Sequence, residues 1–161
     1  MPPLKSAITV AAVVEFAGRF LVVEERIRGR LVLNQPAGHV EDRESLLAAV
    51  VREAREETAW LFEPQSLLGV YHWRNADNGV TTLRFAFRGP VSDHHPLQPL
   101  DHPVVRTLWL TRAQLKSRDN SLRSPLVLRC VDDWLAGKSL PLDAVAELDL
   151  ESARRMQAVE V

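Results

Sequence analysis

The sequence predicts an α/β domain of ordinary size, on three observations. Runs of β-branched and aromatic residues, separated by turn signals, occupy much of the chain. Residues 44–58 contain no Gly or Pro and are rich in Ala, Leu, Glu and Arg, which favours a long helix. The composition, with 46% hydrophobic and 25% charged residues among 161, is that of a globular protein and argues against disorder. Because neither a repeat nor an interdomain linker interrupts the pattern, we expect one domain over residues 1–161.

The first strands are expected near the N-terminus. Residues 7–14 form a continuous apolar run, which is typical of a strand buried on both faces. A turn at 17–18 and a second apolar run at 20–24 predict the return strand of a hairpin. A further turn at 28–30 precedes a predicted strand at 31–33.

The remaining elements follow the helix at 44–58. The segment 89–103 holds four prolines and three histidines, so we expect an irregular loop there. The expected regular elements are strands at 68–73, 82–87 and 104–110, a short helix capped by Thr111, a helix from Ser124-Pro125 to about Ala136, and a weakly helical tail at 143–156.

Charge and composition exclude several classes of partner. Twenty basic and twenty-one acidic residues give a net charge of -1, so no basic field attracts nucleic acid. The single cysteine, Cys130, excludes an internal disulfide and a cysteine-built zinc site, and we expect it to pack in the core. Apolar runs fall short of the ~20 residues of a membrane span, and the N-terminus lacks a signal-peptide layout. We expect a cytoplasmic protein with a small-molecule partner, either a monomer or a homodimer.

Three carboxylates on the predicted helix suggest chemistry. Glu53, Glu56 and Glu57 stand at i, i+3 and i+4, so they share one helix face with Cβ atoms ~5–6 Å apart. Their repulsion is relieved either by the neighbouring Arg52 and Arg55 or by a hard divalent cation such as Mg²⁺ or Mn²⁺. The helix alone leaves both a solvated acidic face and a metal site open.

The residues before the helix decide between these alternatives. Pro36 and Gly38 predict a bend at which the backbone approaches a ligand closely. From Gly38 the chain runs five residues to Glu44, seven more, and then Arg52-Glu53-Ala54-Arg55-Glu56-Glu57-Thr58-Ala59-Trp60. This spacing resembles the Nudix box, Gly-x5-Glu-x7-Arg-Glu-U-x-Glu-Glu-x-Gly-U, at six of its seven fixed positions. The departure is Ala59, which replaces a glycine and must either accept about 1 kcal/mol of strain or let the helix continue.

The resemblance implies a fold and a reaction. Nudix enzymes are α/β/α sandwiches with a mixed sheet, and they hydrolyse nucleoside diphosphates linked to another group with the help of Mg²⁺. For the box at 38–60, it implies that the Gly38 carbonyl and the carboxylates of Glu53, Glu56 and Glu57 bind metal, and that Glu44 and Arg52 orient them. Either Glu53 or Glu57 is then expected to be the general base, with Asp101 of the long loop as an outside candidate. We expect Trp60 to pack in the core.

Segments beyond the box resemble a subgroup of bacterial Nudix phosphatases. They lie at 22–25, 34–39, 83–85 and 122–127, whereas the tail from about 142 to 161 matches poorly. The subgroup releases orthophosphate from nucleoside tri- and diphosphates, and also acts on hydroxymethylpyrimidine pyrophosphate. Two alternatives remain open: a Nudix pyrophosphohydrolase that releases pyrophosphate from dNTPs, and a non-catalytic nucleotide-binding module.

Several polar and aromatic residues are candidates for substrate contacts. A guanidinium on a strand either grips a phosphate or forms a salt bridge across the sheet, and a strand aromatic either stacks on a base or packs in the core. Glu24 either bonds a base or ribose or is an exposed strand position. The candidates are Gln35, His39, Trp73, Arg84, Phe85 and Arg123.

Overall fold

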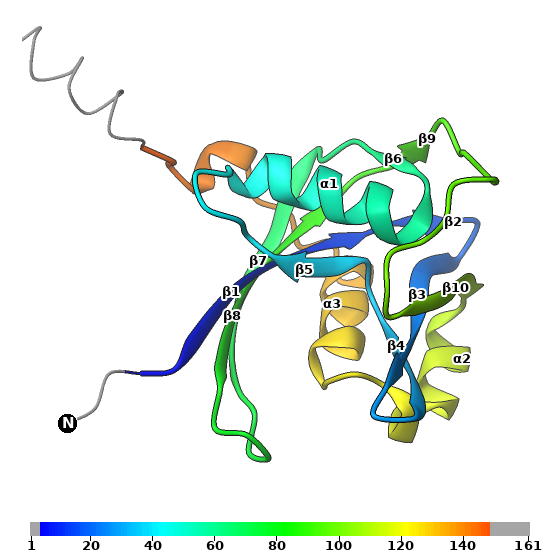
Figure 1. Cartoon of the computed structure of the whole chain (residues 1–161). Coiled ribbons are helices and arrows are strands. Elements are labelled where there is room, and N and C mark those ends of the chain that lie inside the picture. The colour runs from blue at the N-terminus through cyan, green and yellow to red at the C-terminus, as the bar shows by residue number, and fades with distance from the viewer. Residues whose placement is uncertain (1–3, 149–161) are drawn as a thin grey trace, which may run out of the picture.

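The computed structural model describes residues 4–148, in which helices lie on both sides of a twisted sheet (Figure 1). The helices are α1 (Leu46–Thr58), α2 (Arg112–Ser117) and α3 (Leu126–Leu135), with 3₁₀ turns η1 (Asp119–Ser121) and η2 (Leu142–Ala144). The strands are β1 (Ser6–Val13), β2 (Glu15–Phe16), β3 (Arg19–Ile27), β4 (Arg30–Asn34), β5 (Ala37–His39), β6 (Leu61–Phe62), β7 (Ser66–Arg74), β8 (Thr81–Arg88), β9 (Val91–Ser92) and β10 (Val104–Leu110).

The central sheet is mixed. Its strand order is β5-β1-β8-β7, in which β1 and β8 run parallel and the other neighbours run antiparallel. A second sheet has the order β10-β3-β2, with β4 also paired to β3, and β6 pairs with β9. The parallel pairing places Thr9 beside Arg84, so strands far apart in sequence meet at the site described below.

Two apolar layers explain why the first strand is apolar throughout. Val10 and Ala12 of β1 belong to a core cluster that packs against α1. Ala11 and Val13 point to the other face, where they join a cluster that includes Val127 and the buried Cys130 of α3. In Figure 1, α1 and α3 lie on opposite sides of the sheet. The predicted α/β/α sandwich with a mixed sheet is therefore confirmed.

Most predicted elements are present, with corrections at their ends. The long helix begins at Leu46 because the Ser45 side chain accepts a hydrogen bond from the Ala48 N–H and caps it. The hairpin at 17–18 joins β3 to the short strand β2, and not to the run at 7–14, which pairs with β5 and β8. The loop at 89–103 contains β9. The predicted helical tail is only the turn η2 in the described part, and its remainder beyond residue 148 lies outside the described residues.

Two predictions about single residues are also settled. Thr111 caps α2 with a full capping box, as expected. Trp60 packs only partly against the core and stacks on the His94 ring of the long loop, with ring centroids 4.3 Å apart. No helix among residues 4–148 is long and apolar enough to cross a membrane.

Ala59 accepts the strained conformation at the end of α1. Its φ is 60° and its ψ is 14°, and its N–H donates to the Arg55 carbonyl at 2.9 Å. Because this left-handed conformation costs an L-residue about 1 kcal/mol or more, we expect Ala59→Gly to raise the free energy of unfolding by about 0.5–1 kcal/mol. Ala48→Gly, on the exposed face of the same helix, should lower it by a similar amount. Denaturant titration checks the pair, and equal effects of the two substitutions would contradict this account.

Candidate active site

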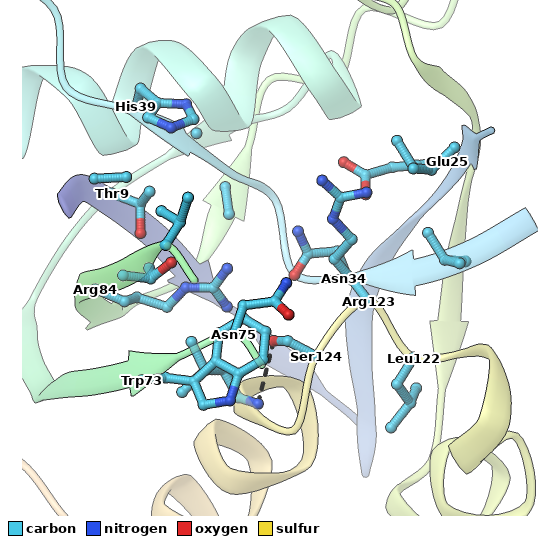
Figure 2. Close-up of a pocket in the computed structure, with 18 of the residues that line it drawn as sticks. Thr9, Glu25, Asn34, His39, Trp73, Asn75, Arg84, Leu122, Arg123 and Ser124 are labelled. Carbon is cyan, nitrogen blue, oxygen red and sulfur yellow. Dashed lines mark hydrogen bonds between the residues drawn. The ribbon is translucent and has the colours of Figure 1, made fainter. Parts of the chain in front are cut away.

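A cavity of about 910 Å³ opens between α1 and the two sheets. One wall carries residues of β1, β7 and β8, a second carries residues of β3 and β4, and the segment before α3 completes it (Figure 2). The box glycine Gly38 and the carboxylates Glu53 and Glu57 lie along the α1 side. This volume is within the range of pockets that hold a small molecule of nucleotide size.

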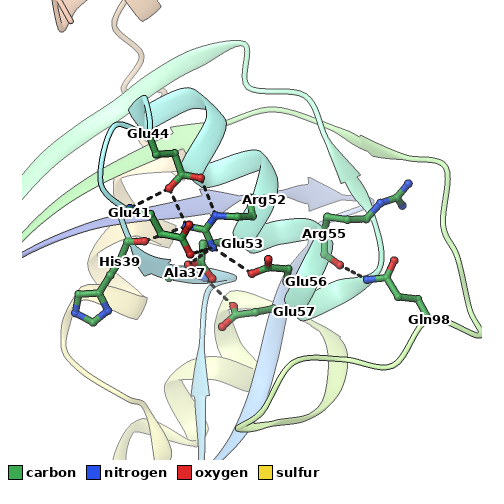
Figure 3. Close-up of polar contacts among 10 residues, drawn as sticks. All are labelled: Ala37, His39, Glu41, Glu44, Arg52, Glu53, Arg55, Glu56, Glu57 and Gln98. Carbon is green, nitrogen blue, oxygen red and sulfur yellow. Dashed lines mark hydrogen bonds and ion pairs between the residues drawn. The ribbon is translucent and has the colours of Figure 1, made fainter. Parts of the chain in front are cut away.

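Arg52 organises the carboxylates of the box (Figure 3). Its Nε and Nη2 donate to Glu44 at 2.7 and 2.9 Å, and its Nη1 donates to Glu53 at 2.8 Å and Glu56 at 3.1 Å. Nη2 also donates to the His39 carbonyl at 3.1 Å, which ties α1 to β5. The planar guanidinium makes several bonds in fixed directions, so it holds the carboxylates in one arrangement.

β5 packs directly against the face of α1 that carries the box glutamates. The Ala37 N–H donates to Glu57 Oε2 at 2.9 Å. A Cβ on Gly38 would overlap the Glu53 carboxylate, so only glycine permits this approach. The bend predicted at 36–38 therefore brings two box glutamates against the strand that lines the cavity.

Glu53 and Glu57 of the box lie in surroundings that disfavour the ionised form of a carboxylate. The pKa of Glu57 is raised to about 8, chiefly by burial. The hydrogen bond from Ala37 lowers this pKa, and the nearby carboxylates of Glu25, Glu53 and Asp101 raise it. Burial likewise raises the pKa of Glu53, although Arg52 opposes this. Such a cluster is stabilised by a cation.

The donor set fits a hard divalent ion, because every side-chain donor is a carboxylate oxygen. Within residues 4–148, however, no group of three or more His, Cys, Asp or Glu side chains is arranged to hold a metal ion. In this arrangement the Arg52 guanidinium holds Glu53 and Glu56 together.

The far side of the cavity contains a glutamate that the sequence did not identify as a candidate site residue. Glu25 of β3 is 6% exposed and lines the cavity, whereas its neighbour Glu24 accepts a 2.7 Å hydrogen bond from Arg106 and lies outside it. The idea that Glu24 contacts a base is therefore wrong. The strand's two-residue period would have distinguished the two faces, but only once the cavity side of β3 was known.

Four candidate substrate residues line the cavity: His39, Trp73, Arg84 and Arg123. Arg84 is 6% exposed on β8. Gln35 does not line the cavity. It is buried, its Nε2 donates to the Val127 carbonyl at 2.8 Å, and its Oε1 accepts from Arg84 Nη1 at 3.4 Å. Gln35 thus orients Arg84 from behind.

The structure corrects the prediction that Phe85 contacts the substrate. It follows Arg84 on β8, so its side chain points to the opposite face of the sheet and packs against the cluster beneath α1. It does not line the cavity, and stacking on a bound base is not its role. Asp101 lies near the site: its N–H donates to the Glu56 carbonyl at 3.0 Å, and its charge acts on Glu57.

Comparison with known proteins agrees with this geometry. The family model described as the NUDIX domain matches residues 3–130. This chain is a member of the Nudix family. Phosphatase NudJ of Escherichia coli K12 is 37% identical over 145 residues, which cover 90% of this chain and 94% of NudJ. The predicted resemblance to the phosphatase subgroup is confirmed.

Solved structures show the same fold. A NUDIX hydrolase from Nitrosomonas europaea has a TM-score of 0.88 and 44% identity, covering 91% of this chain and 99% of the other. The NUDIX domain of Shewanella oneidensis NrtR, solved with ADP ribose, has a TM-score of 0.64 at 16% identity, covering 82% and 88%, and supports the fold alone. The chain is thus a Nudix hydrolase and a homologue of the NudJ phosphatase. Hydrolases of this family act on small nucleotide substrates and generally use divalent metal ions.

Proposed function

We propose that this hydrolase cleaves phosphoanhydride bonds of nucleoside tri- and diphosphates, and of hydroxymethylpyrimidine pyrophosphate, and releases orthophosphate. The observation that supports this most is the pair of carboxylates, the half-buried Glu53 and the buried Glu57, on the wall of a nucleotide-sized cavity. The 37% identity to NudJ over 90% of the chain supports the choice of products.

Each box residue has a role in this proposal. Glu53, Glu56 and Glu57, with the Gly38 carbonyl, would hold Mg²⁺, with Mn²⁺ as a substitute. When bound, the ion neutralises phosphate charge and lowers the pKa of an attacking water. The water oxygen bonds to phosphorus, the bridging oxygen leaves with the electron pair of the broken bond, and a carboxylate takes the water's proton. We assign that proton to Glu57, the most buried of the box carboxylates, which lies on the cavity wall and is held in place by the Ala37 N–H.

The remaining residues of the site orient the carboxylates or bind the substrate. Arg52 and Glu44 fix the direction of the metal-binding carboxylates through the hydrogen bonds described above. Arg84 and Arg123 provide positive charge in the cavity, and Trp73 offers a flat surface to a ring. We further propose that residues 1–161 form one cytoplasmic domain that acts on small molecules and not on nucleic acid, as a monomer or homodimer.

A product assay tests the reaction. Purified protein with Mg²⁺ is given nucleoside tri- and diphosphates and hydroxymethylpyrimidine pyrophosphate, and orthophosphate and pyrophosphate are quantified separately. Orthophosphate from both tri- and diphosphates is expected. Pyrophosphate together with a monophosphate would retain the family's chemistry and overturn the proposed products. Absence of any product would favour a nucleotide-binding module.

Removal of metal should abolish turnover. The side-chain donors are carboxylates only, which prefer hard cations to Zn²⁺. After treatment with a chelator and its removal, we expect added Mg²⁺ or Mn²⁺ to restore orthophosphate release better than Zn²⁺. Full activity in the presence of excess chelator, or best restoration by Zn²⁺, would contradict the proposed site.

A further inference from the structure

The deep part of the cavity contains unsatisfied hydrogen-bonding groups. In the part of the chain that the structure describes, four buried side-chain atoms lack a hydrogen-bond partner. All four belong to residues that line this cavity, and each residue is at least nine-tenths buried. They are Thr9 Oγ1, Glu25 Oε2, Asn34 Oδ1 and Arg84 Nε. Because an unpaired buried polar group costs about 1–3 kcal/mol, such a cluster in one cavity points to a ligand that pairs with it.

The mixture of donors and acceptors indicates the chemistry of that ligand. Glu25 Oε2 and Asn34 Oδ1 are acceptors, Arg84 Nε is a donor, and the Thr9 hydroxyl is either. An ionised phosphate offers only acceptors, so it would leave two of these atoms unpaired and would face the Glu25 carboxylate. A ring that carries an amino group and, at another position, an acceptor atom satisfies both kinds of atom.

The walls of the cavity suit a flat ring. Glu25 comes from β3 and Arg84 from β8, so the two lie on different walls, and Figure 2 draws Asn34 between them. Trp73 of β7 lines the same space, and Val32 and Leu122 add apolar surface elsewhere on its walls. Aromatic and apolar walls with a few polar groups at fixed positions are the usual features of a ring-binding pocket.

We infer that Glu25 and Arg84, with Asn34, bind an amino-bearing nucleobase between the two walls. Glu25 accepts a hydrogen bond from the exocyclic amino group, and Arg84 Nε, on the other wall, donates to an acceptor atom elsewhere on the ring. Cytosine and adenine carry this amino group, whereas uracil and hypoxanthine carry in its place an oxo group that would face the carboxylate. The inference rests on the proposed function, since it names the base that enters the same site.

Equilibrium binding tests the assignment without requiring turnover. Calorimetry with Mg²⁺ present compares CMP with UMP and AMP with IMP, on the parent, on Glu25→Gln and on Glu24→Gln. We expect the parent to bind the amino-bearing member of at least one pair about tenfold more tightly. Glu25→Gln should bring that ratio close to one, because an amide can turn its donor toward an oxo group. Glu24→Gln should keep the parent ratio, since Glu24 faces Arg106 and not the cavity.

The outcomes separate this inference from the proposed function. Equal binding within both pairs by the parent, or no detectable binding of any of the four nucleotides, would overturn it. So would a parent ratio that survives Glu25→Gln. A ratio that Glu25→Gln removes and Glu24→Gln keeps would support it, even if the product assay detected no hydrolysis and so overturned the proposed function. Thermal unfolding of both variants confirms that the comparison is made on folded protein.

Discussion

Glu57→Gln should lower kcat for nucleotide hydrolysis at least about a hundredfold, the usual scale for loss of a metal ligand or general base. The carboxylate is 7% exposed, accepts the Ala37 N–H and lies on the cavity wall. The amide keeps the shape and one acceptor oxygen, but it neither takes a proton nor binds a cation strongly. Steady-state rates with saturating Mg²⁺ measure the effect, and near-parental turnover would exclude Glu57 from the chemistry.

The same substitution should leave the fold intact or improve it when metal is absent. The folded-state pKa of Glu57 is raised from 4.5 to about 8, so the folded protein holds this proton over a range in which the unfolded chain has lost it. The contribution of this group to stability is therefore lost as pH rises from about 4.5 through about 8. Glu57→Gln should show a shallower decline of unfolding free energy over that window in metal-free buffer. A steeper decline would mean that Glu57 carries a stabilising charge.

Glu63→Gln is the matched control for both measurements. Glu63 is exposed and lies outside the cavity. Its substitution replaces the same carboxylate by the same amide. Its turnover and its pH dependence of unfolding should equal those of the parent.

Gly38→Ala should abolish most of the activity and spare the fold. The new Cβ would overlap the Glu53 carboxylate, which is the far end of a flexible side chain and can swing away. The stability cost is then small, but Glu53 leaves the position in which Arg52 holds it. We expect kcat to fall at least about tenfold and Mg²⁺ to bind more weakly, because ~1 Å of misplacement at a reacting centre costs up to about a hundredfold in rate.

Gly89→Ala should show the opposite pattern, a loss of stability without a loss of activity. A Cβ there would overlap the backbone carbonyl of Glu63, which has no comparable freedom to move. Gly89→Ala should therefore lower the free energy of unfolding by about 1–3 kcal/mol and leave the turnover of the folded fraction unchanged. Urea titration measures the free energy of unfolding of each variant, and rates per mole of folded enzyme measure its activity. Together they distinguish the two variants. If Gly38→Ala proved the less stable but the more active of the two, the proposed packing of Glu53 would be wrong.

Local chemistry accounts for what the sequence by itself determined. The i, i+3, i+4 spacing of Glu53, Glu56 and Glu57 needs only helix geometry to place them together, and Thr111 caps its helix through contacts within three residues. The Nudix spacing from Gly38 to Glu57 is a contiguous pattern, so the family, the mixed α/β fold and the box residues were all readable along the chain.

Only the tertiary structure decided which residues face the cavity. Glu24 and Glu25 are identical in type and adjacent, and their roles differ because Arg106 of β10 lies against one and the cavity against the other. Arg84 and Phe85 differ in the same way, since alternate residues of a strand face opposite sides of the sheet. Gln35 supports Arg84 and does not line the cavity, because Val127, 92 positions away, takes its amide. These contacts join strands and helices far apart in sequence, so no local pattern contains them.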